Sequence, residues 1–147
     1  MKIKVIGVGK IKQKELLKLI DDYTKQIKDI TIIEIPDEKD IVGMDKEGKQ
    51  ILSKIEKEDY VVALAIEGKQ LDSEGFADVI DKVSTFHSSS MTFIIGGSYG
   101  LSDFVKQRAD LLLSFSKMTF PHQLMRLMLI EQIYRAFTII SGVSYHK

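Results

Sequence analysis

The sequence predicts an α/β domain whose mostly parallel sheet is flanked by helices. Short apolar segments rich in β-branched residues alternate with segments whose apolar residues recur every three or four positions. The short segments are apolar throughout rather than at every second position, as in strands that are covered on both faces. No linker, repeat or low-complexity tract breaks this order, so residues 1–147 are predicted to form a single domain.

Five segments are predicted to be strands. The first is bounded by glycines, the second stops at Pro36, and the fourth runs into Gly96 and Gly97. The third is nearly all apolar, and the fifth consists mainly of leucine. The predicted strands cover residues 3–8, 30–35, 60–66, 91–95 and 111–115.

Five helices are predicted in the gaps and at the end of the chain. Asp72 or Ser73 is expected to cap the third helix and Ser102 the fourth, because their side chains can accept hydrogen bonds from free amides of the first turn. Pro121 is expected to begin the fifth, where its fixed φ suits a first helical position. The residues that mark these helices lie within residues 16–27, 45–55, 73–83, 102–107 and 121–140.

The composition excludes several kinds of site. The chain has no cysteine, which excludes disulfides, thiol nucleophiles and zinc sites built on thiolates. Its three histidines, His87, His122 and His146, do not have the spacing of a metal motif, so we predict no metal. The apolar runs are too short to span a membrane, and the N-terminus enters a strand without a signal-peptide pattern. We therefore expect a cytoplasmic protein without a membrane partner.

The net charge is zero but unevenly distributed. Residues 1–20 carry six Lys and one Glu, residues 21–99 carry nine Lys and seventeen acids, and residues 100–147 carry six Lys or Arg and three acids. If the two ends fold together, they form a basic face that suits a polyanion such as RNA. The alternative is that the charges scatter over solvated helix faces.

Gly7 and Gly9 follow the first predicted strand and could begin a dinucleotide-binding fingerprint. The third glycine of that fingerprint is absent, which favours a tight turn between strand and helix. A nucleotide-binding protein that uses these two glycines therefore stands as an alternative function.

Two loops are predicted to form a ligand site. Residues 96–100 hold three glycines after the fourth strand, and residues 115–122 form an unusually apolar connection after the fifth. Both follow strands of a parallel sheet, so they share its carboxyl edge, where ligands bind in open α/β sheets. Glycines let the backbone approach a ligand closely, and an apolar loop needs something to cover it.

The last predicted helix is apolar almost all round. Such a helix must be covered on several sides, so we predict that one side packs on the sheet and another on a second copy in a two-fold dimer. The alternative is a central helix of a monomer. Glu131 and Arg135 are spaced to pair with each other. Arg126 has no acid three or four residues away, and it is expected to face a site or a phosphate.

Four stretches of the sequence form specific motifs. Residues 96–101 read Gly-Gly-Ser-Tyr-Gly-Leu, residues 113–122 read Leu-Ser-Phe-Ser-Lys-Met-Thr-Phe-Pro-His, residues 129–136 read Leu-Ile-Glu-Gln-Ile-Tyr-Arg-Ala, and the chain closes with Tyr145-His146-Lys147. These stretches resemble a known family, the small SPOUT-class methyltransferases of large-subunit rRNA, in their "H" branch, which acts on a pseudouridine. The resemblance covers essentially the whole chain, and residues 2–10 and 33–36 also fit it.

The resemblance implies an α/β fold with a C-terminal trefoil knot, S-adenosylmethionine as cofactor, and a homodimer. It also implies methylation of N3 of a pseudouridine in 23S rRNA on the ribosome. Ala65 departs from the family's pattern, where an acidic residue is expected, and the loop after Pro36 is shorter than usual. By this likeness the cofactor pocket consists of Leu64, Gly96, Phe115, Ser116, Lys117, Met118, Thr119 and Phe120.

The implied chemistry is a direct displacement of a methyl group from a sulfonium onto a ring nitrogen, which must lose its proton. We assign the base role to His146, with Tyr145 and Arg126 positioning the base or a phosphate. In such a dimer the tail of one subunit is expected to complete the other's site. A ribosome-associated RNA-binding module of the same fold that has lost turnover is the alternative.

Overall fold

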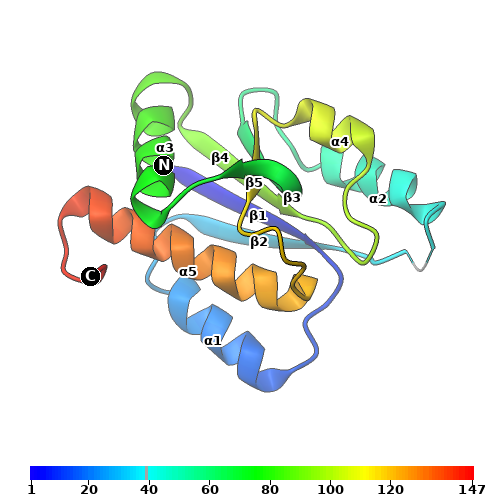
Figure 1. Cartoon of the computed structure of the whole chain (residues 1–147), viewed down its shortest axis with the longest axis horizontal. Coiled ribbons are helices and arrows are strands. Elements are labelled where there is room, and N and C mark those ends of the chain that lie inside the picture. The colour runs from blue at the N-terminus through cyan, green and yellow to red at the C-terminus, as the bar shows by residue number, and fades with distance from the viewer. Residues whose placement is uncertain (39) are drawn as a thin grey trace.

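The computed structural model describes residues 1–38 and 40–147, and their strands form one parallel sheet in the order β2-β1-β4-β3-β5 (Figure 1). Each strand is followed by a helix, which confirms the predicted α/β architecture with a parallel sheet. The strands are β1 (Lys2–Val8), β2 (Ile30–Ile35), β3 (Tyr60–Gln70), β4 (Ser90–Ile95) and β5 (Leu111–Ser114).

Helices cover both faces of the sheet. The last helix lies between the first and the third on one face, and the second and fourth lie together on the other (Figure 1). No helix among the described residues has the length and apolar character needed to cross a membrane. The helices are α1 (Lys14–Thr24), α2 (Gly43–Leu52), α3 (Ser73–Phe86), α4 (Asp103–Arg108) and α5 (His122–Ser141).

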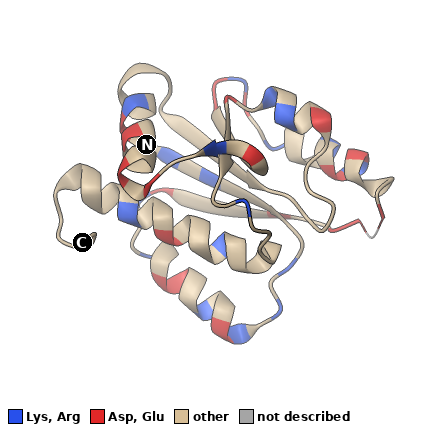
Figure 2. Cartoon of the chain, viewed as in Figure 1, with Lys and Arg blue, Asp and Glu red and all other residues tan. Residues whose placement is uncertain are grey.

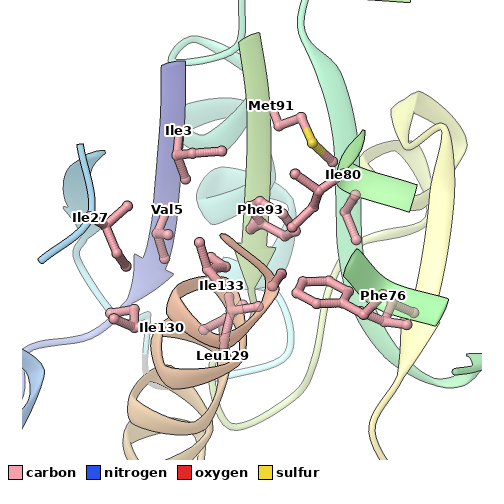
Figure 3. Packing of buried hydrophobic residues seen from close by; sticks show 14 of the residues in the cluster. Ile3, Val5, Ile27, Phe76, Ile80, Met91, Phe93, Leu129, Ile130 and Ile133 are labelled. Carbon is pink, nitrogen blue, oxygen red and sulfur yellow. The ribbon is translucent and has the colours of Figure 1, made fainter. Parts of the chain in front are cut away.

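The larger core lies between the sheet and α5 (Figure 3). Leu129, Ile130 and Ile133 of α5 are fully buried against sheet residues such as Val5. Phe93 of β4 packs on Phe76 of α3, with ring centroids 5.9 Å apart. Full burial of one such side chain stabilises the fold by about 1.5–3 kcal/mol, so this layer fixes α5 on the sheet.

The observed bounds of the elements differ from the predicted ones mainly at helix ends. Residues 30–35 form a strand as predicted, because Pro36 ends it. Helices α1 and α2 end at Thr24 and Leu52, whereas the predicted ranges ran on to Ile27 and Ile55. These two residues are apolar and pack on the core just beyond the helices, so they continue the apolar pattern without being helical. Asp72 caps α3 by accepting a hydrogen bond from the Gly75 amide at 2.7 Å. Ser102 occupies the cap position of α4, but its buried hydroxyl has no partner among the described residues.

Candidate cofactor site

A cavity of about 390 Å³ opens at the carboxyl ends of β3, β4 and β5. Its size falls in the range of small-molecule sites, and its walls are mostly apolar. It brings together the two loops that the sequence indicated, although they lie about 20 residues apart in the chain. Seven of the eight predicted pocket residues line it: Leu64, Gly96, Phe115, Ser116, Met118, Thr119 and Phe120. Lys117 is not among its lining residues.

The turn after β4 forms the glycine-rich wall of the cavity. Gly100 has a φ of +81°, a left-handed conformation that favours glycine, and its amide donates to the Gly97 carbonyl at 3.0 Å. A Cβ atom on Gly96 would lie 2.8 Å from the Gly100 carbonyl. Glycine is therefore required at position 96, because the turn folds back directly onto the end of the strand.

The loop after β5 forms the opposite, apolar wall. The Ser114 hydroxyl donates to the Ser116 carbonyl at 3.0 Å, and the Ser116 hydroxyl accepts from the Met118 amide at 3.0 Å. These bonds fix the loop without using its other amides, since those of Thr119 and Phe120 meet no acceptor within residues 1–38 and 40–147. A ligand in the cavity can therefore find free main-chain groups beside apolar side chains.

An irregularity in β3 forms the third wall. The strand pairs with β5 at Leu64, and the pairing resumes only at Lys69, so residues 65–68 bulge outward. A Cβ atom on Gly68 would lie 2.6 Å from the Leu112 carbonyl, so glycine lets the returning strand approach β5. Sequence reasoning placed the end of this strand at residue 66 and missed the bulge. Gly68 was the available signal, because a glycine inside a strand often marks one.

The bulge also places a charged pair at the rim of the cavity. The Lys106 Nζ atom lies 2.7 Å from Glu67 Oε1, and this hydrogen bond lowers the pKa of Glu67. Both residues line the cavity, as does Ala65 at the position where the family resemblance led us to expect an acid. The acidic side chain in this wall is thus Glu67, two residues further along, with its charge already matched by a lysine.

Arg126 lies outside this cavity, on the buried side of α5. Its Nη1 atom donates to Glu34 Oε2 at 2.6 Å and its Nη2 atom to the Gly9 carbonyl at 2.9 Å. A Cβ atom on Gly7 would lie 2.5 Å from the guanidinium, so Gly7 makes room for Arg126. The sequence led us to expect Arg126 at a ligand site or phosphate. The structure instead supports a buried structural role, in which the guanidinium joins Glu34 to the Gly9 carbonyl. Its partner Glu34 is 92 residues away in the chain, beyond the reach of a helical-spacing argument.

The same contacts explain why glycine occupies position 7, near the end of β1, and position 9, just after it. Gly7 faces the Arg126 side chain, and Gly9 has a φ of +91° in the turn that follows. The turn therefore supplies space for an arginine rather than a cradle for a pyrophosphate. This placement favours the tight-turn interpretation over a dinucleotide fingerprint.

The C-terminal tail lies against α1, α3 and α5, and it does not line the cavity. The Tyr145 hydroxyl lies 3.4 Å from that of Tyr23, and this hydrogen bond raises the pKa of Tyr145 to about 12. The His146 Nδ1 atom lies 3.0 Å from Arg135 Nη1, and Arg135 is also held by Glu131, as its spacing predicted. Within one chain, the predicted catalytic tail and the predicted pocket are thus separate.

A second cavity, of about 610 Å³, lies between α1, α3 and α5. Leu113, Phe115 and Phe120 line both cavities and form the wall between them. Leu19 of α1, which also lines the second cavity, is 47% exposed. Among the residues that the structure describes, no three acidic or histidine side chains are arranged to hold a metal ion.

Comparisons with known proteins agree on one family. The family model described as a predicted SPOUT methyltransferase matches residues 1–146. The ribosomal RNA large subunit methyltransferase H of Acholeplasma laidlawii (strain PG-8A) is 61% identical over 147 residues, which cover 100% of both chains. The protein of the same name from Bacillus pumilus (strain SAFR-032) is 54% identical over 159 aligned residues, again covering 100% of both.

Solved structures of low sequence identity share the fold. The ribosomal RNA small subunit methyltransferase E of Neisseria gonorrhoeae, bound to S-adenosyl methionine, has a TM-score of 0.55 at 12% identity over 95% of this chain. The SpoU methyltransferase AviRb of Streptomyces viridochromogenes, in complex with AdoMet, has a TM-score of 0.52 at 9% identity over 99% of this chain. The chain spans 66% and 59% of the lengths of these two structures.

The resemblance drawn from the sequence is therefore confirmed by independent comparisons. The family model covers nearly every residue, and both named relatives are more than half identical over their full lengths. The chain belongs to the SPOUT methyltransferases, in the ribosomal RNA large subunit methyltransferase H family.

Proposed function

We propose that residues 1–147 form a single methyltransferase domain that methylates N3 of a pseudouridine in 23S rRNA, using S-adenosylmethionine and acting as a cytoplasmic homodimer on the ribosome. The observation that carries this proposal is the cavity at the carboxyl edge of the sheet. It unites the glycine turn at Gly96 with the apolar loop at residues 115–120, which belong to two of the four stretches that carry the family resemblance.

The residues of the cavity fit a sulfonium nucleoside. Apolar side chains such as Leu64 and Phe120 offer walls for a flat adenine ring, and free amides of the β5–α5 loop offer donors to its edge. Bound there, S-adenosylmethionine would supply an electrophilic methyl group, and the apolar side chains and loop amides of the cavity would hold and orient it. Alignment of this kind supplies a large part of the rate in such displacements.

The position of the tail supports a site shared between two subunits. The tail contacts Arg135, whereas the cavity reaches α5 at His122 and Met125. Arg135 follows His122 by 13 residues, which is about 20 Å along a helix at 1.5 Å per residue. Figure 1 shows the tail at the end of α5 that lies away from the β5–α5 loop. A tail from a second copy can reach the cavity where the chain's own tail cannot.

The face formed by α1 and α5 is suited to the second copy. Leu19 is 47% exposed and Leu124 is 41% exposed, and the second cavity lies between their helices. Apolar surface of this kind is typical of a protein interface. We propose that this face forms the two-fold contact, and that the C-terminal segment threads a loop to form the trefoil knot expected of the family.

An unpaired lysine cluster supports an RNA substrate. Lys10 and Lys12 are exposed in the connection between β1 and α1, and Lys14 is exposed at the first position of α1; none of the three forms an ion pair among the described residues (Figure 2). The cluster follows β1 at the carboxyl edge of the sheet, the edge on which the cavity opens. Phosphate groups of a polyanion are attracted to lysines at such a place.

Transfer of labelled methyl from S-adenosylmethionine to ribosomes that lack this modification tests the proposal. We expect one methyl group per ribosome, mapped by mass spectrometry to a pseudouridine of 23S rRNA. Ribosome binding without transfer would instead support the RNA-binding module that has lost turnover. Calorimetric binding of NAD in place of S-adenosylmethionine would support the nucleotide-binding alternative and contradict the proposal.

A further inference from the structure

The C-terminal tail is held in one orientation by contacts that fix the His146 ring. Tyr145 packs edge-on against Tyr134, with ring centroids 4.8 Å apart, and Arg135 Cζ lies 4.8 Å from the centre of the Tyr145 ring. Arg135 Nη1 reaches past this ring to His146 Nδ1 at 3.0 Å. The tail is therefore held by two contacts with Arg135, the stacking of Tyr145 and the hydrogen bond to His146, and by the packing of Tyr145 on Tyr134.

Arg135 itself is fixed by Glu131. Its Nε atom donates to Glu131 Oε1 at 2.7 Å and its Nη2 atom donates to Oε2 at 3.4 Å, so the carboxylate binds one edge of the guanidinium through both oxygens. Both residues belong to α5 and lie one helical turn apart. The donor that faces His146 is thus supported by a rigid helix rather than by a loop.

The chemistry of arginine decides which nitrogen of His146 carries the proton. A guanidinium has only donors and stays protonated in proteins. His146 Nδ1 must therefore be the acceptor, and the proton of the neutral ring lies on Nε2. Glu74 Oε1 lies 3.8 Å from Nε2, too far for a hydrogen bond, and the Glu74 side chain is 74% exposed. The Nε2–H group is free to donate to a ligand.

We propose that His146 serves the methyl transfer as a hydrogen-bond donor through Nε2–H, and that Arg135 is the positioning residue that sets this tautomer. The inference rests on the proposed function. A neutral ring whose Nδ1 is occupied and whose Nε2 is protonated has no free lone pair to accept a proton. His146 therefore takes a different role from the base that the sequence led us to assign.

The proposed step balances without a protein base. The N3–H bond of the pseudouridine breaks and its proton passes to water, so negative charge spreads over N3 and the two neighbouring carbonyl oxygens. The N3–C bond then forms as the C–S bond breaks, and the electron pair of that bond stays on the sulfur. Nε2–H donates to one of the carbonyl oxygens, where the charge develops, and stabilises it.

Nitrogen NMR of the histidine rings tests the tautomer directly. The chain has three histidines, and His146→Gln removes one set of signals and so assigns that ring, with His87→Gln as the matched control. At pH 8 we expect His146 in the intact protein to be protonated at Nε2 only. We expect Arg135→Met to give a mixture of the two tautomers. A mixture or an Nδ1–H ring in the intact protein would overturn the proposal, whether or not the protein methylates RNA.

Kinetics on the ribosome test the donor role. Gln at position 146 can place an amide N–H near the position of Nε2–H, but it cannot accept a proton at neutral pH. We expect His146→Ala to lower kcat about 100-fold, and His146→Gln to stay within about tenfold of the intact protein with an unchanged pH profile. If both variants lose activity equally, the donor role fails. The proposed function is contradicted in this experiment by a different result, the absence of methyl transfer by the intact protein.

Discussion

The two edges of the sheet are built from different contacts. At the amino edge, polar side chains from β1 and β4 converge on one buried carboxylate and satisfy it. At the carboxyl edge, the loops leave some amides without a partner among the described residues, a cavity is open, and the fold disfavours the charge of one buried carboxylate. Stability and ligand binding therefore depend on opposite ends of the same strands, and ligands in open α/β folds commonly bind at the carboxyl ends.

Asp59 is the centre of the amino edge. It accepts hydrogen bonds from the Ser90 hydroxyl at 2.8 Å, the Thr92 hydroxyl at 3.0 Å and the Glu56 amide at 2.9 Å, and Lys4 Nζ lies 3.4 Å away. Burial alone would raise the pKa of Asp59, but these hydrogen bonds and the lysine outweigh it, and the pKa is lowered. The charged form is thus favoured by the fold.

Glu47 of α2 shows the opposite balance at the carboxyl edge. It accepts a hydrogen bond from the Glu38 amide at 2.6 Å, but two further acids, Asp37 and Glu38, are its neighbours. Burial is the main reason why the pKa of Glu47 is raised, and the charge of Asp37 adds to it. The fold thus disfavours the charged form of Glu47, in part because the segment that follows β2 places acids beside it.

The largest expected effect is at the cavity. Gly96→Val places a side chain where the Gly100 carbonyl would be 2.8 Å from its first carbon, so the turn must shift, and the wall that it gives the cavity shifts with it. We expect the affinity for S-adenosylmethionine to fall at least about 1,000-fold, or about 4 kcal/mol, when measured by calorimetry. Gly142→Ala, at the far end of α5, is the matched control and should bind normally. Unchanged affinity in Gly96→Val would remove the glycine turn from the site.

The amino edge should respond in stability and not in binding. Asp59→Asn replaces one carboxylate oxygen with an NH2 group that cannot accept hydrogen bonds, and it leaves Lys4 without its opposite charge. We expect it to cost about 3 kcal/mol of unfolding free energy, measured in urea. Its pKa is lowered from 3.8, so the stabilisation is present above that pH and is lost as the pH falls through the folded value. The difference from the intact protein should therefore shrink in acid. A loss of affinity for S-adenosylmethionine of more than twofold would contradict the inference that the amino edge does not contribute to ligand binding.

A smaller effect is expected where the two glycines follow β1. Gly7→Ala brings a methyl group to within 2.5 Å of the Arg126 guanidinium and forces it away from Glu34 and the Gly9 carbonyl. We expect a destabilisation of about 2 kcal/mol in urea unfolding. The variant should still bind S-adenosylmethionine, because Arg126 does not line the cavity. Loss of binding with no change in stability would restore a ligand role for this turn.

The smallest expected effect has the opposite sign. Glu47→Gln removes a disfavoured charge and keeps an acceptor for the Glu38 amide, so we expect the variant to be about 1 kcal/mol more stable at pH 7. The pKa of Glu47 is raised above 4.5, so the neutral carboxyl stabilises the fold below that pH, and this contribution is lost as the pH rises through the folded value. The gain should therefore vanish near pH 4. Equal gains at both pH values would exclude charge as the cause.

The order of the elements and most of the pocket could be predicted from local sequence. Pro36 ended a strand where expected, and glycines marked the turn at residues 96–100. The rest depends on contacts that local patterns do not contain. Arg126 meets an acid 92 residues away, and the cavity wall at residues 65–68 exists only because β3 slips its register against β5.

The site at the end of the chain shows the same limit. The closing Tyr145 and His146 were singled out from the sequence, but the distance between tail and cavity required the length of α5. Sequence patterns find which residues can do chemistry. The fold decides which of them can meet within one chain.

Mixing two inactive variants tests most directly whether the site is shared between subunits. Gly96→Val damages the cavity, and His146→Ala damages the tail. If the cavity of one subunit works with the tail of the other, half of the dimers in an equal refolded mixture are mixed and hold one intact site of two. We expect the mixture to recover about a quarter of the methyl transfer of the intact protein. No recovery, with mixed dimers present in native mass spectra, would contradict it.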